Sequence, residues 1–247
     1  MNKYFYDLHT HSALSPCGDN MMTPNNIAGM AALAGLQIVA LTDHNTAKNC
    51  PAFFTACKRY GVVPVGGMEL TTAEEIHVVC LFPTLESALE FDHMVEQHRM
   101  HIANKTEIFG EQLIMDDEDN VIGSDEWYLP AATDIPLESV PGLVRRHGGI
   151  CYPAHIDRPS GGLPFILGDF PPDVDFATYE LHDISKRAEY EEKFPILKNM
   201  NCVSCSDAHY LDQIRDAEFS LMLDDEPYSS AMLRISLLKT LSRRKDN

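Results

Sequence analysis

The sequence predicts an α/β protein, a distorted (β/α)7 barrel with a small helical or irregular insertion. Short apolar runs typical of strands alternate with helix-like segments over most of the 247 residues. About seven such units fit in this length, and alternation of this kind produces a mainly parallel sheet. Histidine and acidic residues follow several of the apolar runs, at the strand ends where barrels carry their functional side chains.

The first half of the chain contains four predicted strands, over residues 4–11, 36–41, 62–65 and 76–82. A helix is expected after Thr23 because a capping hydroxyl precedes Pro24 at the first helical position, and Gly35 ends it. A second helix is expected to end at Gly61. A long, mainly helical segment should follow over residues 86–105.

The second half resumes the pattern after an excursion. Residues 111–139 are acidic and contain prolines, so we expect an insertion at about 92–136 within one domain that spans residues 1–247. Further strands are expected at 150–154, 175–181 and 201–206, and further helices at 137–147, 185–193 and 227–243. The last helix should bury Met232, Leu233, Ile235, Leu237 and Leu238.

The charge balance is strongly acidic, with 19 Lys and Arg against 37 Asp and Glu and a net charge of −18. A protein that holds DNA or RNA by its phosphates needs clusters of basic residues. We therefore expect no extended nucleic-acid binding. A small phosphorylated substrate stays compatible with this charge if bound metal cations supply positive charge locally.

The chain shows no membrane or export signal. Its longest apolar runs fall short of the roughly 20 residues of a membrane span, and its first residues lack the apolar core of a secretory signal. Seven cysteines are an odd number, which favours reduced thiols and a cytoplasmic protein. Cys202 and Cys205 could form half of a zinc site or a redox pair, but without a second cysteine pair we interpret them as buried structural thiols.

Two histidine motifs leave apolar strands. In His9-x-His11 the residues i and i+2 of a strand point to the same side, so two imidazoles can bind one metal ion. A pair of packed or solvated histidines would have the same spacing. Asp207-x-His209 repeats the geometry near the other end of the chain, which makes chance a weaker explanation.

Two acidic residues also suggest a metal site. Asp43 beside His44 is either a carboxylate that orients a metal-bound imidazole or a helix cap next to a surface histidine. Glu69 follows two glycines on an apolar strand, where an unpaired charge would be costly to bury. A carboxylate that bridges two metal ions is one arrangement that makes this burial tolerable.

The remaining histidines have simpler interpretations. We expect structural or surface roles for His93, His98, His101 and His147. His182 follows an apolar strand and could face the site as a substrate contact or proton donor.

Taken in their order along the chain, the histidine and acidic motifs resemble those of the PHP family, the polymerase and histidinol phosphatase superfamily. The resemblance covers residues 6–210 and rests on Asp7-Leu-His9-Thr-His11-Ser, Thr42-Asp43-His44, Glu69 with His77, Ala154-His155 and Ser206-Asp207-Ala-His209. It implies a barrel with two or three divalent metal ions, Zn, Mn or Fe, that hydrolyses a phosphomonoester or phosphodiester.

The resemblance also implies a ligand set. One metal ion would be held by His9, His11, Glu69 and Asp207, a second by His44, His209 and the bridging Glu69, and a third by His77 and His155. The second ion usually takes one more ligand from the loop after the first motif. Asp19 is our choice there, with Cys17 close enough to compete.

The expected catalytic residues are Glu69, Asp207 and Arg158. Relatives often show proline after the histidine that corresponds to His155, and the Ile156 found here departs from that pattern. Arg158 still resembles the family's phosphate-binding arginine, since a guanidinium suits bidentate phosphate contact. The alternative for Arg158 is an ion pair on the surface.

Three other functional classes have specific requirements. A metal-dependent amidohydrolase commonly uses a carbamylated lysine, and no lysine here ends a suitable strand. A proofreading exonuclease would need a basic path for a strand, and a non-catalytic metal-binding regulatory module should have lost some ligands. We therefore expect a metal-dependent phosphoesterase.

Overall fold

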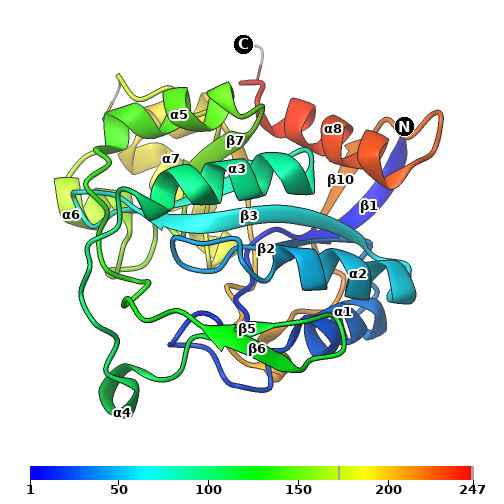
Figure 1. Cartoon of the computed structure of the whole chain (residues 1–247). Helices are drawn as coiled ribbons and strands as arrows, with labels where there is room; N and C mark the ends of the chain where they lie inside the picture. Colours follow the sequence, from blue (N-terminus) through cyan, green and yellow to red (C-terminus); the bar gives the residue numbers. More distant parts are fainter. Residues whose placement is uncertain (172, 246–247) are drawn as a thin grey trace.

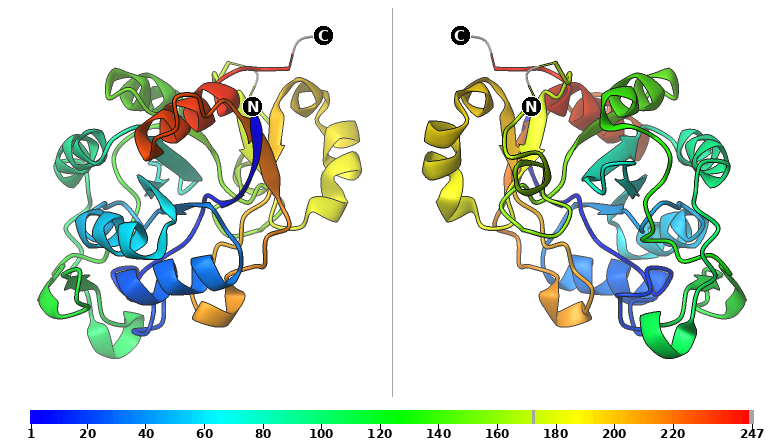
Figure 2. Two further views of the ribbon diagram at one scale, coloured as in Figure 1. Left: turned by 90° about the vertical axis from the view of Figure 1, so that its right-hand side faces the viewer. Right: turned by 90° about the vertical axis from the view of Figure 1, so that its left-hand side faces the viewer.

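The computed structural model describes residues 1–171 and 173–245, and in it the strands curl into a barrel with helices around it (Figures 1 and 2). Among these residues the main sheet has six strands in the order β10-β1-β2-β3-β4-β7. They are β1 (Asn2–Asp7), β2 (Ile38–Leu41), β3 (Val63–Thr71), β4 (His77–Phe82), β7 (Ile150–Pro153) and β10 (Ser220–Leu223). Strands β1, β2 and β3 are parallel, whereas β4 is antiparallel to both of its neighbours.

Two further strands complete the ring, β8 (Thr178–Glu180) and β9 (Asn201–Val203), which pair in parallel. The amide of Ile156, just past β7, donates to the carbonyl of Glu180 at 2.9 Å. On the other side, the amide of Asp207 donates to the carbonyl of His9 at 2.9 Å, which joins the segment after β9 to the segment after β1. The predicted distorted barrel is confirmed.

Helices cover the outside of the barrel. They are α1 (Pro24–Leu33), α2 (Cys50–Tyr60), α3 (Leu85–Glu96), α5 (Val140–Arg146), α6 (Leu163–Leu167) and α7 (Arg187–Lys193), with 3₁₀ turns at Leu137–Ser139, Ile184–Lys186, Pro195–Asn199 and Leu211–Gln213. The side chain of Thr23 accepts a hydrogen bond from the amide of Asn26, and Gly61 ends α2 at φ 72°. Both predicted helix boundaries are confirmed.

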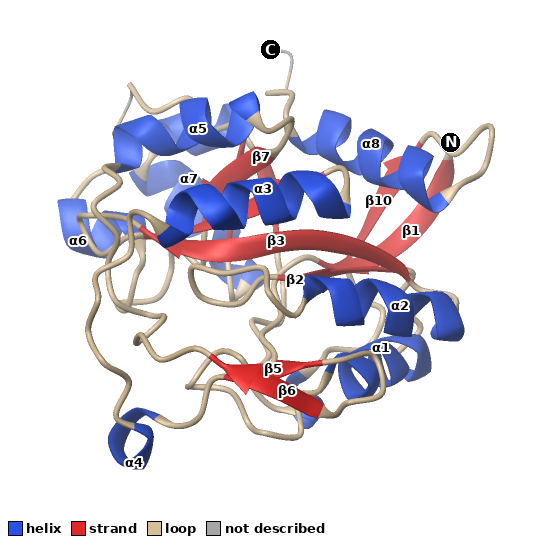
Figure 3. Cartoon of the chain, viewed as in Figure 1, coloured by secondary structure: helices blue, strands red, loops and turns tan. Residues whose placement is uncertain are grey.

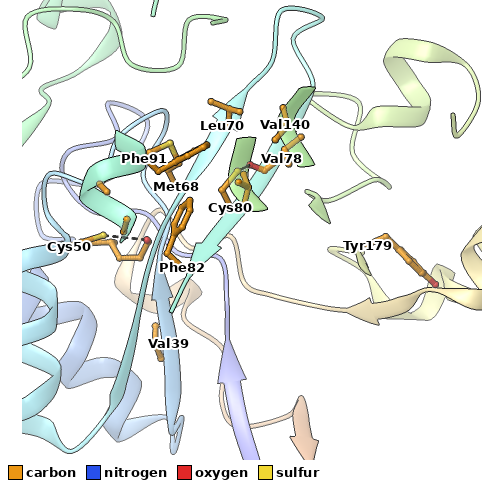
Figure 4. Close-up of a cluster of buried hydrophobic side chains, with 14 of the residues drawn as sticks. Val39, Cys50, Met68, Leu70, Val78, Cys80, Phe82, Phe91, Val140 and Tyr179 are labelled. Carbon is orange, nitrogen blue, oxygen red and sulfur yellow. Dashed lines mark hydrogen bonds between the residues drawn. The ribbon is translucent and has the colours of Figure 1, made fainter. Parts of the chain in front are cut away.

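The barrel has two apolar clusters, one on each side of its wall. Inside, Val63 and Val65 of β3 pack with Tyr152, and Leu237 of α8 (Ser230–Leu241) belongs to the same cluster. Outside, β3 and β4 pack against the helices, and Figure 4 shows Met68 and Phe82 beside Phe91 of α3. Side chains alternate between the faces of a strand, so the inward row of Val63 and Val65 continues to Glu69.

The excursion lies beside the barrel, mostly as loops (Figure 3). It carries α4 (Thr106–Phe109) and the hairpin of β5 (Leu113–Met115) and β6 (Val121–Ser124). The predicted helix over 86–105 is wrong beyond Glu96. After this point the buried Arg99 donates a hydrogen bond to Asp125 at 3.0 Å, and this contact joins the segment after α3 to the excursion.

Other elements also differ from expectation. Strand β10, at the edge beside β1, was not predicted. In α8, Met232 and Ile235 are exposed, whereas Leu233, Leu237 and Leu238 are buried as expected. In the described part of the chain, no helix combines the length and apolarity that a membrane crossing needs.

Candidate metal centre

The strand ends bring the predicted ligands to one rim of the barrel. His9 and His11 follow β1, His44 follows β2, Glu69 lies near the end of β3, His155 follows β7, and Asp207 and His209 follow β9. His77 begins its strand, but β4 runs antiparallel and pairs it with Thr71 at the end of β3. The start of β4 therefore meets the same rim.

Glu69 is the centre of the cluster and is almost completely buried. Its Oε1 lies 2.9 Å from Nδ1 of His77, 2.9 Å from Nε2 of His155 and 3.4 Å from Nε2 of His9. Its Oε2 lies 3.1 Å from Nδ1 of His44 and 3.4 Å from Nε2 of His11. One carboxylate thus faces five imidazoles, which is more than it can bind by ordinary hydrogen bonds.

One group of donors has the spacing of a single metal ion. Nε2 of His9 lies 3.1 Å from Nε2 of His11, and Oδ1 of Asp207 lies 3.4 and 3.1 Å from these two nitrogens. Glu69 completes this group. A tetrahedral ion with ligand distances of about 2.0–2.1 Å needs donor atoms about 3.3 Å apart. The group therefore fits a divalent ion.

Two further groups share residues with the first. His11, His44 and His209 form one, and His44, Glu69 and His77 form the other. Among the described residues, Nδ1 of His44 and Oδ1 of Asp207 are buried and face other members of the cluster, but neither makes a hydrogen bond of good geometry. Buried polar atoms normally have partners, so these atoms also fit ions bound between them. His155 and Asp207 have φ angles of 23° and 51°, strain of the kind found at functional sites.

The electrostatics of the cluster leave its acids ionised. Burial would raise the pKa of Glu69, but the charges of His77, His9 and His44 hold it well below its usual value. The pKa of Asp207 is lowered in the same way, against burial, by His9 and His11. Two buried anions therefore lie where cations would balance them.

The histidine pKa values split in two directions. Burial would lower the pKa of His11, but the carboxylates of Asp207 and Glu69 beside its ring raise it to about 9. Burial lowers the pKa of His44 to about 4 and that of His209 to about 3. His44 and His209 are thus neutral at pH 7, the form in which imidazole binds a metal ion.

Sequence reasoning missed the carboxylate behind His9. Glu180, at the end of β8, is fully buried, and its oxygens lie 3.0 and 3.2 Å from Nδ1 of His9. A carboxylate in this position orients a metal-binding imidazole. The available signal was a charged residue between the apolar Tyr179 and Leu181.

Asp43 takes part in the site through serines. Its oxygens accept hydrogen bonds from the hydroxyls of Ser12 at 2.6 Å and Ser15 at 2.7 Å, and Ser15 lies 3.0 Å from Nδ1 of His11. Asp43 thus supports His11 rather than the ring of His44. This is the first of the two expectations for Asp43, a carboxylate that supports an imidazole of the site, but the imidazole is that of His11 and the contact runs through Ser15.

Arg158 lies inside the site. It donates to Oδ2 of Asp207 and, at 2.9 Å, to Nε2 of His182. The backbone carbonyl of His182 also accepts a hydrogen bond from the guanidinium of Arg215 at 3.0 Å. Burial lowers the pKa of His182, and the charges of Arg158 and Arg215 lower it further, so its ring is a neutral acceptor that holds Arg158 in place.

Gly161, three residues after Arg158, fixes the position of His77. Gly161 has φ 68°, and its carbonyl accepts from the amide of His77 at 2.9 Å. A Cβ at this position would lie 2.4 Å from Cγ of the His77 ring. Only glycine combines this backbone angle with so close an approach.

The structure places the other candidates as follows. Asp19 lies beside His209 through a backbone hydrogen bond, and its Oδ1 accepts from the amide of Met21, outside the three ligand groups. Cys17 lines the cavity above the cluster. The seven cysteines are free thiols, with Cys205 buried and Cys202 partly buried. His98 pairs with Asp134, and His147 bonds its own helix at the carbonyl of Leu143.

The cluster opens into a cavity of about 650 Å³. His44, Glu69, His77, His155, Asp207 and His209 lie in its lining, together with Arg158. Residues 130–132 and Tyr128 of the excursion also line this cavity. The cavity is large enough for a small ligand or for one unit of a polymer.

Comparison with known proteins agrees with this geometry. A model of the PHP domain matches residues 7–132, just over half of the chain. A 5′-3′ exoribonuclease of Haemophilus influenzae is 30% identical over 114 residues, which cover 42% of this chain and 40% of that protein. The chain therefore aligns with less than half the length of this relative.

Solved structures share the fold. The lesion-specific endonuclease Q of Pyrococcus furiosus superposes with a TM-score of 0.66 and 20% identity, over 99% of this chain and 57% of its own. An amidohydrolase of Chromobacterium violaceum has a TM-score of 0.53 and 17% identity, over 89% of this chain and 92% of its own. A Bifidobacterium adolescentis protein described as a metal-dependent phosphoesterase has a TM-score of 0.50 and 17% identity, over 83% of this chain and 87% of its own.

The exclusion of nucleic acid in the sequence analysis is wrong. Endonuclease Q, which matches nearly the whole chain in fold, has also been solved with a 27-mer duplex that carries an abasic lesion at the active site. The error was to use the net charge of the chain as a measure of the charge at the site. Metal ions and single arginines such as Arg158 set the local charge in a site of this kind.

The family assignment rests on three findings together. The PHP domain model covers the motifs from His9 to His77. The fold is shared over most of the chain with endonuclease Q and with a protein described as a metal-dependent phosphoesterase. Histidine and acidic side chains converge at one rim with the spacing of metal ligands. The chain therefore belongs to the PHP domain family, and its histidine, glutamate and aspartate cluster fits the metal site of a hydrolase.

Proposed function

We propose that the chain hydrolyses phosphoester bonds, those of nucleotides and nucleic acids included, with two or three divalent metal ions bound at the rim. The observation that carries the proposal is the position of Glu69, whose two oxygens lie within 3.4 Å of five histidines. A shared carboxylate is typical of sites that hold several ions close together. We also propose that residues 1–247 act as one domain, with the excursion as its insertion.

The ligand assignment follows the groups described above. His9, His11, Glu69 and Asp207 would hold one ion, and His44 and His209 a second, with Glu69 shared. Asp19 would join the second ion only after its carboxylate leaves the amide of Met21. His77 and His155 would hold a third ion beside Oε1 of Glu69. The mixture of imidazole and carboxylate suits Zn, Mn or Fe.

The residues around the ions would bind the phosphate and hold the other side chains in position. When bound, the ions would supply a water activated at neutral pH and offset the charge of the phosphoryl oxygens. Arg158 would donate to a phosphoryl oxygen, as a planar guanidinium does well. His182 would keep Arg158 aimed at that oxygen, and Glu180 and Ser15 would hold the rings of His9 and His11.

The amidohydrolase alternative finds less support. One solved structure with this fold is an amidohydrolase, but a likeness at 17% identity concerns the fold alone. Within the described residues, the cavity lining contains no lysine that could be carbamylated, and Glu69 lies where the ions would be bridged. A phosphoesterase is therefore the proposal that the site favours.

The test is a substrate panel on purified protein reconstituted with Zn, Mn or Fe. It contains p-nitrophenyl phosphate, bis(p-nitrophenyl) phosphate, mononucleotides, single-stranded and duplex oligonucleotides, and an amide and a carboxylic ester as controls. We expect chelator-sensitive hydrolysis of at least one phosphoester and two or three ions per chain by elemental analysis. Hydrolysis of only the amide or carboxylic ester, or stoichiometric metal with no turnover, would reject the phosphoesterase in favour of an amidohydrolase or a regulatory module.

A further inference from the structure

One part of the wall of the site cavity is apolar and aromatic. It consists of Tyr128 and residues 130–132 of the excursion, with Ile166 of α6 also in the lining. None of these side chains carries a charge, and none is needed to bind ions or a phosphate. The proposed function therefore leaves this wall unexplained.

Tyr128 is backed by a second aromatic ring. Its ring centroid lies 4.3 Å from that of Phe109 in α4, with the two planes 34° apart. Tyr128 is partly buried and lines the cavity together with Cys17, and burial raises the pKa of its hydroxyl. A supported ring of this kind presents a flat surface with little rotamer freedom to lose.

The wall is also tied to the metal site. Asn45, next to His44, donates from its amide group to the carbonyls of Leu129 and Ala131 at 2.7 and 2.9 Å. The same side chain accepts from the amide of Thr71 at 2.8 Å. One buried asparagine thus fixes the distance between the wall and the end of β3, so the wall is in place before a ligand binds.

A polar group accompanies the aromatic surface. Thr71 lies two residues beyond Glu69, on the same face of β3, and is also part of the cavity lining. Thr71 is 3% exposed, and its hydroxyl has no hydrogen-bond partner among the described residues. A buried hydroxyl without a partner marks a position where a ligand could supply one.

We propose that Tyr128, supported by Phe109, forms a subsite that stacks an unpaired nucleobase of the substrate, with Thr71 as a hydrogen-bonding group in the same pocket. The inference rests on the proposed function, because the base would enter beside the phosphate held at the rim. A nucleobase fits best because its flat face stacks on an aromatic ring while its edge carries donors and acceptors. The substrate would thus be a nucleotide unit whose base is not paired.

The experiment compares AMP with ribose 5-phosphate, which has the same sugar and phosphate but no base. Both are tested on metal-reconstituted protein as substrates or, where they are not turned over, as competitive inhibitors of bis(p-nitrophenyl) phosphate hydrolysis. Stacking on an aromatic side chain is worth about 1–3 kcal/mol, so AMP should be favoured by about 5–150-fold. Tyr128→Ala should remove most of this preference, and Tyr128→Phe should retain it.

The control variant is Tyr60→Ala, which removes an exposed tyrosine at the end of α2, outside the cavity lining. It should keep the preference for AMP. Equal recognition of the two compounds by the wild type, or an unchanged preference in Tyr128→Ala, would overturn the base subsite while leaving phosphoester hydrolysis intact.

A calorimetric titration with adenosine separates the two proposals. If no phosphoester is bound or hydrolysed, the proposed function fails. The base subsite then stands only if adenosine binds the wild type and Tyr128→Phe but not Tyr128→Ala. Absence of adenosine binding in that case would overturn the subsite as well.

Discussion

Both carboxylate oxygens of Glu180 lie within hydrogen-bonding distance of Nδ1 of His9, at 3.0 and 3.2 Å. On the other side of the ring, Nε2 of His9 faces Glu69 and Asp207, each at 3.4 Å. The imidazole is therefore held between a carboxylate behind it and the ligand cluster in front. Such a pair fixes the tautomer of a metal-binding histidine and increases its basicity.

Replacing Glu180 by glutamine should weaken metal binding while the fold is retained. Glutamine keeps the size of the side chain but removes the charge behind His9, and losses of this kind typically cost about 10–100-fold in metal affinity. Competition with a chelator measures the affinity. Asp92→Asn is the matched control, since Asp92 is a buried acid that bonds the amide of Ala47 away from the ligands. Equal affinities in wild type and Glu180→Gln would contradict the role of Glu180.

The contact between Gly161 and His77 predicts different effects for two glycine substitutions. Gly161→Ala should displace the His77 ring, because the new Cβ would lie 2.4 Å from it. Gly168→Ala is the control, with a similar φ of 79° and no atom within 4 Å of the added carbon. Both variants should lose about 1 kcal/mol of stability through the backbone angle.

Activity and metal content separate the two glycine variants. Gly161→Ala should lose at least part of its bound metal and most of its turnover, and Gly168→Ala should keep both. Equal activity in the two variants would show that the position of His77 does not matter to the centre.

Metal-free protein should become less stable as pH rises from 6.5 towards about 8.5, where unfolded cysteines begin to ionise. Burial lowers the pKa of His11, but Asp207 and Glu69 outweigh it and raise the pKa from 6.5 to about 9 on folding. A raised pKa contributes stability that is complete below 6.5 and lost as pH passes through the folded value. His9 and His155 shift in the same direction.

Thermal unfolding with and without a chelator tests this pH dependence. The Tm of the metal-free protein should fall across the range, and metal affinity should increase because fewer protons have to leave the imidazoles. A metal-free Tm that rises over the same range would contradict these pKa shifts.

Arg158→Lys should lower kcat/KM by about tenfold or more while metal content stays constant. An ammonium group cannot reproduce the planar fork of arginine towards a phosphoryl oxygen. Arg158 contacts Oδ2 of Asp207, whereas Oδ1 faces His9 and His11, so the ligand oxygen should remain in place. Unchanged kcat/KM with a phosphoester substrate would leave Arg158 as an ion-pair partner of Asp207 only.

The sequence predicted most of the residues that meet at the rim, but it also included Asp19, which lies outside the ligand groups, and it missed Glu180. In a mainly parallel barrel the carboxyl ends of the strands face the same way, so residues that follow separate strands, such as His44 and Glu69, become neighbours. His77 did not fit this rule. Its position became clear only from the antiparallel hairpin of β3 and β4, which a five-residue connection at 72–76 allows but does not by itself specify.

Long-range contacts set the features that could not be predicted. Glu180 supports His9 across 171 positions of sequence, and Asn45 bonds Leu129 across 84. Local patterns contain no information about such pairings. The course of the excursion over the cavity, and thus the wall around Tyr128, depends on these contacts rather than on residue preferences within 97–136.

The measurement that tests the shared metal centre most directly is metal content and turnover of Glu69→Gln, both determined on the same folded fraction. Glutamine keeps the volume of Glu69 but removes the charge that faces five histidines. We expect loss of metal from more than one site and a fall in phosphoester turnover by several orders of magnitude. Near-wild-type metal content and turnover in the folded variant would contradict the bridging role of Glu69 and the shared centre built around it.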